Sequence, residues 1–216
     1  MKIFLDTADT EVISKYFSTG LIDGVTTNPS LIMKSGRNPE DVYQEIKDIG
    51  VQDISMEVVG SDLDMYDEGK RLYEKFGDVC TVKVPCTPEG LSVCKALSDQ
   101  GVKVNVTLIF HAAQAILAAK AGATYVSPFV GRVDDEGYAG LEVVRSITSL
   151  YQIHGVKTQV LSASVRTMGR AVRSFYNGAQ VVTMPPSIFE KMYKSTLTDK
   201  GLEIFDNDWQ AVQSNI

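Results

Sequence analysis

The sequence has few of the residues that build metal centres and disulfide frameworks. It holds only two histidines and three cysteines among 216 residues. The cysteines, Cys80, Cys86 and Cys94, lack the spacing of metal ligands, and their odd number argues against a disulfide scaffold. We therefore expect a metal-free protein of the reducing cytoplasm.

Long apolar runs are also lacking. No stretch of about 18 apolar residues occurs, and the N-terminal segment MKIFLDTADT reaches Asp6 without the apolar region of a signal peptide. The net charge is −6, so the chain lacks the positive excess that attracts nucleic acids or anionic membranes. We expect neither as a partner, whereas a phosphorylated metabolite requires only local positive charge.

Short β-branched runs alternate with longer amphipathic segments from end to end. This alternation predicts parallel strands, and eight rounds of it predict a single-domain (β/α)8 TIM barrel over residues 1–216. The expected strands are 2–6, 24–27, 53–58, 80–84, 103–108, 124–127, 158–163 and 180–183. The expected helices include 39–49, 61–76, 87–100, 111–121, 136–153, 167–177 and 185–193. An open doubly wound sheet is the alternative, but the first strand ends in Leu5-Asp6-Thr7 instead of a glycine-rich phosphate loop.

An additional C-terminal helix is predicted at 199–213. Its apolar residues Leu202, Phe205, Trp209 and Val212 recur at helical spacing. Two interpretations remain open from the residues alone. The helix packs on its own barrel, or it reaches a neighbouring subunit. We expect Trp209 to be a packing residue and not a ligand contact.

Polar residues interrupt the predicted strands at or near their carboxyl ends. Parallel barrel strands are covered on both faces and should read as nearly continuous apolar runs. The carboxyl ends form the face where barrel enzymes carry their active sites. The interrupting residues are Asp6, Thr26, Thr27, Asn28, Glu57, Lys83, Asn105, Thr107, Ser127, Ser162 and Ser164.

Lys83 lies between Val82 and Val84 in the fourth predicted strand. A strand lysine facing solvent is the simplest explanation in an antiparallel sheet, but a parallel barrel has no wet face in mid-strand, and lysine is rarely buried without a partner. Burial favours the neutral amine that attacks a carbonyl, whereas neighbouring carboxylates favour the charged one. We predict that Lys83 forms a Schiff base.

Asp6 and Glu57 are the carboxylates expected beside this amine. Each alone could cap a helix or lie at the surface. Schiff-base chemistry needs proton transfers, and two carboxylates near the amine supply them directly or through a water. Thr107 could hydrogen-bond such a water, although threonine is also a common β-former.

Arg132 and Arg166 are the candidate phosphate ligands. Each follows a predicted strand end by a few residues, in SPFVGR and SASVR. Phosphates commonly bind at the mouth of late barrel strands, and the arginine fork fits phosphate oxygens.

Seven segments occur in the order and spacing of the transaldolase family: FLDTAD, GVTTNPSL, MEV, VKVP, NVTLIF, SPFVGR and SASVR. The chain resembles, over nearly its whole length, the short single-barrel form of this family, which includes fructose-6-phosphate aldolases. The resemblance implies transfer of a dihydroxyacetone unit between sugar phosphates through a lysine Schiff base, with no cofactor.

The resemblance also implies roles for individual residues. Lys83 matches the Schiff-base lysine, Asp6 the acid/base aspartate, Glu57 the glutamate that acts through a catalytic water, and Thr107 the threonine that helps hold this water. Arg132 and Arg166 match the phosphate-binding arginines of the family. The predicted substrate-binding residues are Thr26, Asn28, Asn105, Ser127, Phe129 and Ser164, of which the asparagines and serines match positions that bind dihydroxyacetone hydroxyls.

Two positions favour transaldolase over fructose-6-phosphate aldolase. Similar aldolases tend to have glutamine in place of Glu57 and tyrosine in place of Phe129. A tyrosine hydroxyl can orient a water toward the enamine and release the ketone, whereas phenylalanine cannot. Short members similar to this chain assemble as decamers, often by exchanging C-terminal helices, so a homo-oligomer is expected with 199–213 in subunit contacts.

Overall fold

A computed structural model describes residues 1–214, and the last two residues of the predicted domain, 215–216, lie outside the described residues. Eight parallel strands close into a barrel in chain order, β1 to β8, with β8 pairing back onto β1. The strands are β1 (Lys2–Asp6), β2 (Gly24–Thr26), β3 (Ile54–Glu57), β4 (Cys80–Pro85), β5 (Lys103–Ile109), β6 (Tyr125–Pro128), β7 (Gln159–Ser162) and β8 (Val181–Met184). The closed barrel confirms the predicted fold, and the alternative of an open sheet is wrong.

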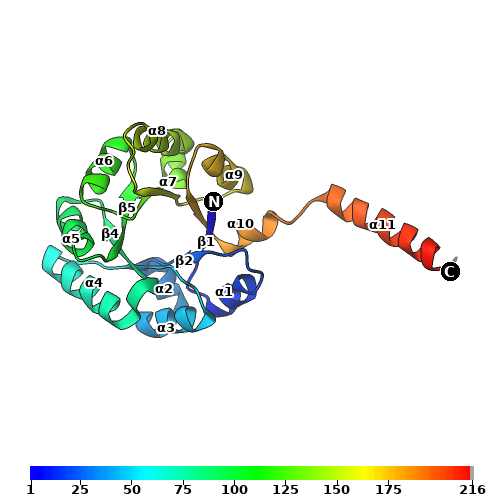
Figure 1. Ribbon diagram of the computed structural model, residues 1–216, viewed down its shortest axis with the longest axis horizontal. Coiled ribbons are helices and arrows are strands. Elements are labelled where there is room, and N and C mark those ends of the chain that lie inside the picture. The colour runs from blue at the N-terminus through cyan, green and yellow to red at the C-terminus, as the bar shows by residue number, and fades with distance from the viewer. Residues whose placement is uncertain (215–216) are drawn as a thin grey trace.

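Helices form a ring outside the strands, and the last helix of the chain extends away from this ring (Figure 1). They are α1 (Thr10–Phe17), α2 (Pro29–Ser35), α3 (Pro39–Ile49), α4 (Asp62–Phe76), α5 (Pro88–Ser98), α6 (Ala112–Lys120), α7 (Val130–Asp135), α8 (Gly140–Ile153), α9 (Met168–Tyr176), α10 (Pro186–Lys191) and α11 (Thr196–Ser214), with a 3-10 turn η1 (Gly77–Val79) before β4. The sequence analysis did not predict α1, α2 and α7, which have eight, seven and six residues. Such short segments give too few turns for a clear helical period.

Local signals fix where several helices begin. The side chain of Ser61 accepts a hydrogen bond from the backbone N–H of Asp64, and the Asp64 carboxylate accepts one from the backbone N–H of Ser61, which makes a capping box at the start of α4. Thr87 caps α5 directly before Pro88, a residue suited to the first helical turn. His111 caps α6 by accepting from the Gln114 N–H.

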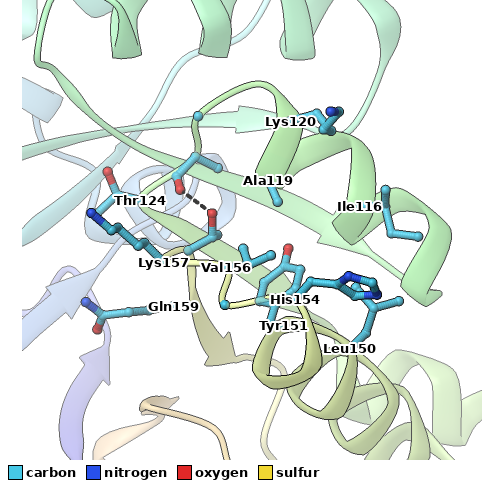
Figure 2. A pocket seen from close by; sticks show the side chains of 14 residues that line it. Ile116, Ala119, Lys120, Thr124, Leu150, Tyr151, His154, Val156, Lys157 and Gln159 are labelled. Carbon is cyan, nitrogen blue, oxygen red and sulfur yellow. Dashed lines mark hydrogen bonds between the residues drawn. The ribbon is translucent and has the colours of Figure 1, made fainter.

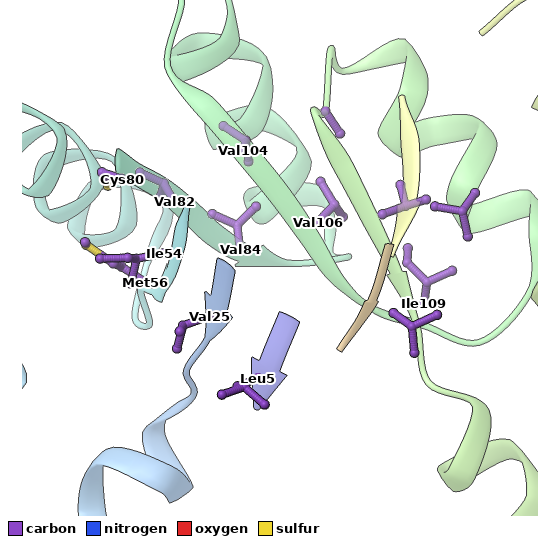
Figure 3. Close-up of a cluster of buried hydrophobic side chains, with 14 of the residues drawn as sticks. Leu5, Val25, Ile54, Met56, Cys80, Val82, Val84, Val104, Val106 and Ile109 are labelled. Atoms are coloured by element: carbon purple, nitrogen blue, oxygen red, sulfur yellow. The ribbon is translucent and has the colours of Figure 1, made fainter. Parts of the chain in front are cut away.

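The core has an outer and an inner part. The outer part lies between the strands and the helices, and Figure 3 shows buried strand residues such as Val82, Val84 and Val104 that belong to it. The inner part fills the barrel itself, where Phe4 meets Tyr125 edge-on at a ring-centroid distance of 6.1 Å. The wall of the barrel is therefore covered on both faces, which leaves its polar strand residues little contact with water.

The C-terminal helix α11 extends away from the barrel (Figure 1). None of its residues is buried, and Trp209 is 62% exposed. The interpretation in which this helix packs on its own barrel is therefore wrong. Within residues 1–214, no helix is long and apolar enough to cross a membrane.

Candidate active site

The amine of Lys83 lies inside the barrel wall beside the carboxylate of Glu57. The strands β3 and β4 pair with Glu57 opposite Lys83, so both side chains point to the same face, and the Lys83 Nζ to Glu57 Oε2 distance is 2.8 Å. Lys83 is 5% exposed and also donates to the carbonyl oxygen of Thr27 at 3.1 Å. A buried charge is tolerated when it is paired and hydrogen-bonded, and both conditions hold here.

A chain of amide and hydroxyl groups continues from this pair along the barrel. Asn105 lies opposite Lys83 in the register of β4 and β5. Its amide nitrogen donates to Ser55 Oγ at 3.2 Å, and its carbonyl oxygen accepts from Ser127 Oγ at 2.7 Å. These contacts fix the orientation of the Asn105 side chain and of Ser127 next to it.

Asp6 occupies the end of β1 and faces a threonine pair. Thr26 Oγ1 donates to Asp6 Oδ1 at 2.8 Å and lies 2.6 Å from Thr183 Oγ1. Burial raises the pKa of the Asp6 carboxyl above its ordinary value, while the Thr26 hydrogen bond and the charge of Lys83 act in the opposite direction. A carboxyl of this kind holds its proton closer to neutral pH, which suits an acid/base group.

A cavity of about 140 Å³ opens at the carboxyl ends of the strands. Eight of the predicted site residues line it: Asp6, Thr26, Asn28, Lys83, Ser127, Phe129, Arg132 and Ser164. The others lie around it. Asn105 and Thr107 are fully buried in β5, and Glu57 lines a separate cavity of about 380 Å³ that also touches α3 and α4. Arg166 does not line the cavity, and its side chain is half exposed.

The hydroxyl of Thr107 is fully buried, and it has no hydrogen-bond partner among residues 1–214. A buried hydroxyl without a partner is costly and uncommon in native proteins. A ligand or water that bonds this hydroxyl would remove that cost. This observation agrees with the expected role of Thr107 in holding a water.

The candidate phosphate ligands lie where α7, which carries Arg132, meets the loop after β7, which carries Arg166. The backbone N–H of Gly131 donates to the carbonyl oxygen of Ser164 at 3.0 Å. A Cβ on Gly131 would come within 2.3 Å of that oxygen and 2.7 Å of Arg166 Nε, so only glycine permits this approach. Ser164 adopts a φ of 57°, a left-handed conformation that is uncommon outside glycine. Arg132 lies over the Phe129 ring, 4.9 Å from its centroid.

Some residues of the site were missed by the sequence analysis. Thr183 lines the cavity and bonds Thr26, and Ser55 supports Asn105. Both are polar residues within apolar strands, the same signal that identified Thr26 and Asn105. The carbonyl oxygen of Thr27 that accepts from Lys83 carried no sequence signal, because it belongs to the main chain.

A larger cavity, of about 880 Å³, lies away from these residues. Figure 2 shows it beside α6, lined by apolar side chains such as Ile116 and Leu150 with Lys120 and Lys157 at its margin. It also touches the segments that precede β6 and β7, so it opens at the opposite end of the barrel. No cluster of three or more potential metal ligands occurs in the described part of the chain.

Comparison with known proteins gives matches over the whole chain. The model of a family described as Transaldolase/Fructose-6-phosphate aldolase matches residues 3–216. A probable transaldolase of Nitrosopumilus maritimus is 50% identical over 216 residues, which cover 99% of this chain and 97% of the relative. A probable transaldolase of Caulobacter vibrioides is 50% identical and one of Paracoccus denitrificans is 51% identical, each with both chains fully covered.

The raised pKa of Asp6 predicts a stability gain in Asp6→Asn at neutral pH. Between the ordinary value of 3.8 and the higher folded value, the folded protein binds more protons than the unfolded chain, so stability falls as pH rises through this window and stays lower above it. Asp6→Asn has no ionisable carboxyl at this position, so it does not lose this stability as the pH rises. Urea unfolding of both proteins from pH 3 to pH 8 should show an advantage for Asp6→Asn at pH 7 that disappears below the window.

The exposed Asp67 provides the matched control, because Asp67→Asn removes the same charge from a solvated helix face. Its free energy of unfolding should change by less than about 0.5 kcal/mol at every pH. A lower stability of Asp6→Asn than of the wild type at pH 7 would contradict the inferred cost of burying the charged carboxylate.

Proposed function

Because the chain belongs to the transaldolase/fructose-6-phosphate aldolase family, we propose that it is a transaldolase that transfers a dihydroxyacetone unit from sedoheptulose 7-phosphate to glyceraldehyde 3-phosphate. The products are erythrose 4-phosphate and fructose 6-phosphate, and the reaction is a reversible step of the non-oxidative pentose phosphate pathway in the cytoplasm. The observation that carries this proposal is the buried amine of Lys83, 2.8 Å from the Glu57 carboxylate. The names of the relatives support an enzyme of transaldolase or aldolase type.

The reaction begins when the neutral amine of Lys83 attacks the ketone carbon of the donor. Glu57, in direct contact with this amine, accepts its proton and returns one to the departing hydroxyl, so that water leaves and an imine forms. The buried hydroxyl of Thr107 and the Glu57 carboxylate hold the water through which these protons pass. No cofactor takes part, because the protonated imine itself withdraws electrons.

Cleavage of the carbon–carbon bond follows from the imine. Asp6 removes the proton of the hydroxyl on the carbon β to the imine carbon, and the bond between the α and β carbons breaks. The β carbon leaves as the aldehyde of the aldose phosphate, and the electron pair of the broken bond passes to the protonated imine, which leaves the dihydroxyacetone unit on Lys83 as an enamine. The acceptor aldehyde then receives the enamine carbon, and Asp6 returns its proton to the new alkoxide. The raised pKa of this carboxyl supports both directions of transfer.

The small cavity matches the size of the transferred unit. Its volume of about 140 Å³ admits a short fragment, so the remainder of the sugar phosphate extends past the mouth. Thr26, Asn28, Asn105, Ser127 and Ser164 supply hydroxyl and amide groups for the hydroxyls of this unit. Beyond them, Arg132 and Arg166 bind the phosphate.

Fructose-6-phosphate aldolase activity is the second candidate, since the family description includes it. Phe129 lines the cavity and has no hydroxyl with which to direct a water onto the enamine. The enamine therefore persists until an acceptor aldehyde arrives, which favours group transfer.

The exposed helix α11 supports assembly into a homo-oligomer. Leu202, Phe205, Trp209 and Val212 recur along it and are 47–71% exposed, and contiguous exposed apolar surface marks interaction sites. We assign α11 to subunit contacts in a decamer.

Lys83→Met should abolish transfer while the barrel remains folded, as judged by circular dichroism. In the wild type, borohydride added with fructose 6-phosphate should trap a covalent adduct on the peptide that contains Lys83, detected by mass spectrometry. Lys95→Met removes an exposed lysine of α5 and should leave trapping intact. An adduct on a different lysine would reject the assignment, and tight binding without any adduct would indicate a non-catalytic sugar-phosphate-binding barrel.

Glu57→Gln should lower kcat by about 10²–10⁴-fold, because it removes the carboxylate that transfers protons during imine formation.

Phe129→Tyr should increase the release of dihydroxyacetone from fructose 6-phosphate in the absence of an acceptor. The wild type should turn over fructose 6-phosphate only when an acceptor aldose phosphate is present. Phe110→Tyr is the matched control, because this ring lies 6.0 Å from Phe129 between centroids but is not among the residues that line the cavity. Steady acceptor-free release by the wild type would identify an aldolase.

Trp209→Asp should dissociate the assembly, whereas Asn207→Asp should not. The two positions lie on opposite sides of α11, and both variants add one negative charge. Sedimentation velocity should give a decamer for the wild type and the control, and a smaller species for Trp209→Asp. A monomeric wild type would exclude the proposed role of α11.

A further inference from the structure

The guanidinium fork of Arg166 is already occupied by a carboxylate. Its Nη1 and Nη2 atoms donate to the two oxygens of Asp135, at the C-terminal end of α7. A phosphate group binds arginine through the same pair of parallel hydrogen bonds. Phosphate and Asp135 therefore require the same face of Arg166.

The other edge of this guanidinium is not open. Arg166 Nε lies against Gly131, where even a Cβ would come within 2.7 Å. The end face held by Asp135 is therefore the face through which Arg166 can receive an anion. Arg132 differs, because it lines the cavity and lies over the Phe129 ring, without a carboxylate in ion-pair contact among residues 1–214.

We propose that Asp135 is a specificity-determining residue: it competes with the substrate phosphate for the fork of Arg166 and so weakens the preference for phosphorylated over unphosphorylated substrates. This inference rests on the proposed function, in which Arg166 is a phosphate ligand. A phosphate dianion carries enough charge to displace one carboxylate, whereas an unphosphorylated sugar does not. Arg166 is thus held in position without substrate and is released from Asp135 only by a strongly anionic group.

The exchange is energetically accessible because the pair lies at the surface. The side chains of Arg166 and Asp135 are 53% and 51% exposed, and exposed ion pairs contribute only modestly to stability. The neighbouring guanidinium holds the pKa of Asp135 below its ordinary value, so the competitor stays charged at neutral pH. Loss of Asp135 should therefore improve phosphate binding by a small factor, about two- to five-fold.

Asp135→Asn in the intact protein is the direct test. The inhibition constant of inorganic phosphate, measured against glyceraldehyde 3-phosphate as acceptor, should fall two- to five-fold. The ratio of kcat/KM for glyceraldehyde 3-phosphate to that for unphosphorylated glyceraldehyde should rise by a similar factor, through KM. Glu142→Gln removes one carboxylate from the exposed pair with Arg145 on α8 and should change neither quantity.

A double-mutant cycle separates competition from a general structural effect. In the Arg166→Ala background, Asp135→Asn should have no further effect on phosphate inhibition, because the contested fork is absent. An unchanged inhibition constant in Asp135→Asn alone, weaker phosphate binding, or an equal effect in both backgrounds would each overturn the proposal. Phosphate binding can also be measured by calorimetry, which does not require turnover. A negative result in that measurement would reject the role of Asp135, whereas a negative result in borohydride trapping on Lys83 would reject the proposed transaldolase function.

Discussion

The ammonium group of Lys83 lies 2.8 Å from the carboxylate of Glu57 within a barrel wall that is covered on both faces. Removing two charges from water costs several kcal/mol per ion, and their attraction offsets this only when the remaining hydrogen bonds are satisfied. The Thr27 carbonyl oxygen accepts one of these hydrogen bonds from Lys83. Such a pair adds little net stability, so its place in the core supports the proposed chemistry, which needs an amine next to a proton acceptor.

The closed barrel is what holds this pair in its geometry. Glu57 is opposite Lys83 in one strand pair, and Lys83 is opposite Asn105 in the next. A shift of one residue in either register would turn a side chain to the other face of the wall. Because β8 pairs back onto β1, no free edge allows such a shift, and Asp6 enters the same mouth from the first strand. The same closure thus fixes the positions of the amine and both carboxylates.

The interior of the site could be predicted from the sequence because burial leaves few alternatives. A lysine between valines, or Thr26 and Asn105 within apolar strands, conflicts with a covered parallel sheet unless these groups meet each other. The direction of α11 could not be predicted in this way. Its apolar spacing is the same whether Trp209 packs on its own barrel or remains available to a second copy, and only the structure excludes the first arrangement. No periodicity or motif spacing in the sequence indicated the contact between Arg166 and Asp135.

Whether a contact could be predicted from the sequence depends on how deeply its residues are buried in the barrel. Around Lys83, partners are buried and fixed by strand register, so in the proposed reaction the geometry around the amine does not change from one substrate to another. Around Arg166, partners are half-exposed side chains on helices and loops, which can exchange at small energetic cost. In the proposed function, recognition of the phosphate can therefore vary through residues such as Asp135 without disturbing the buried amine, because no strand register connects the two.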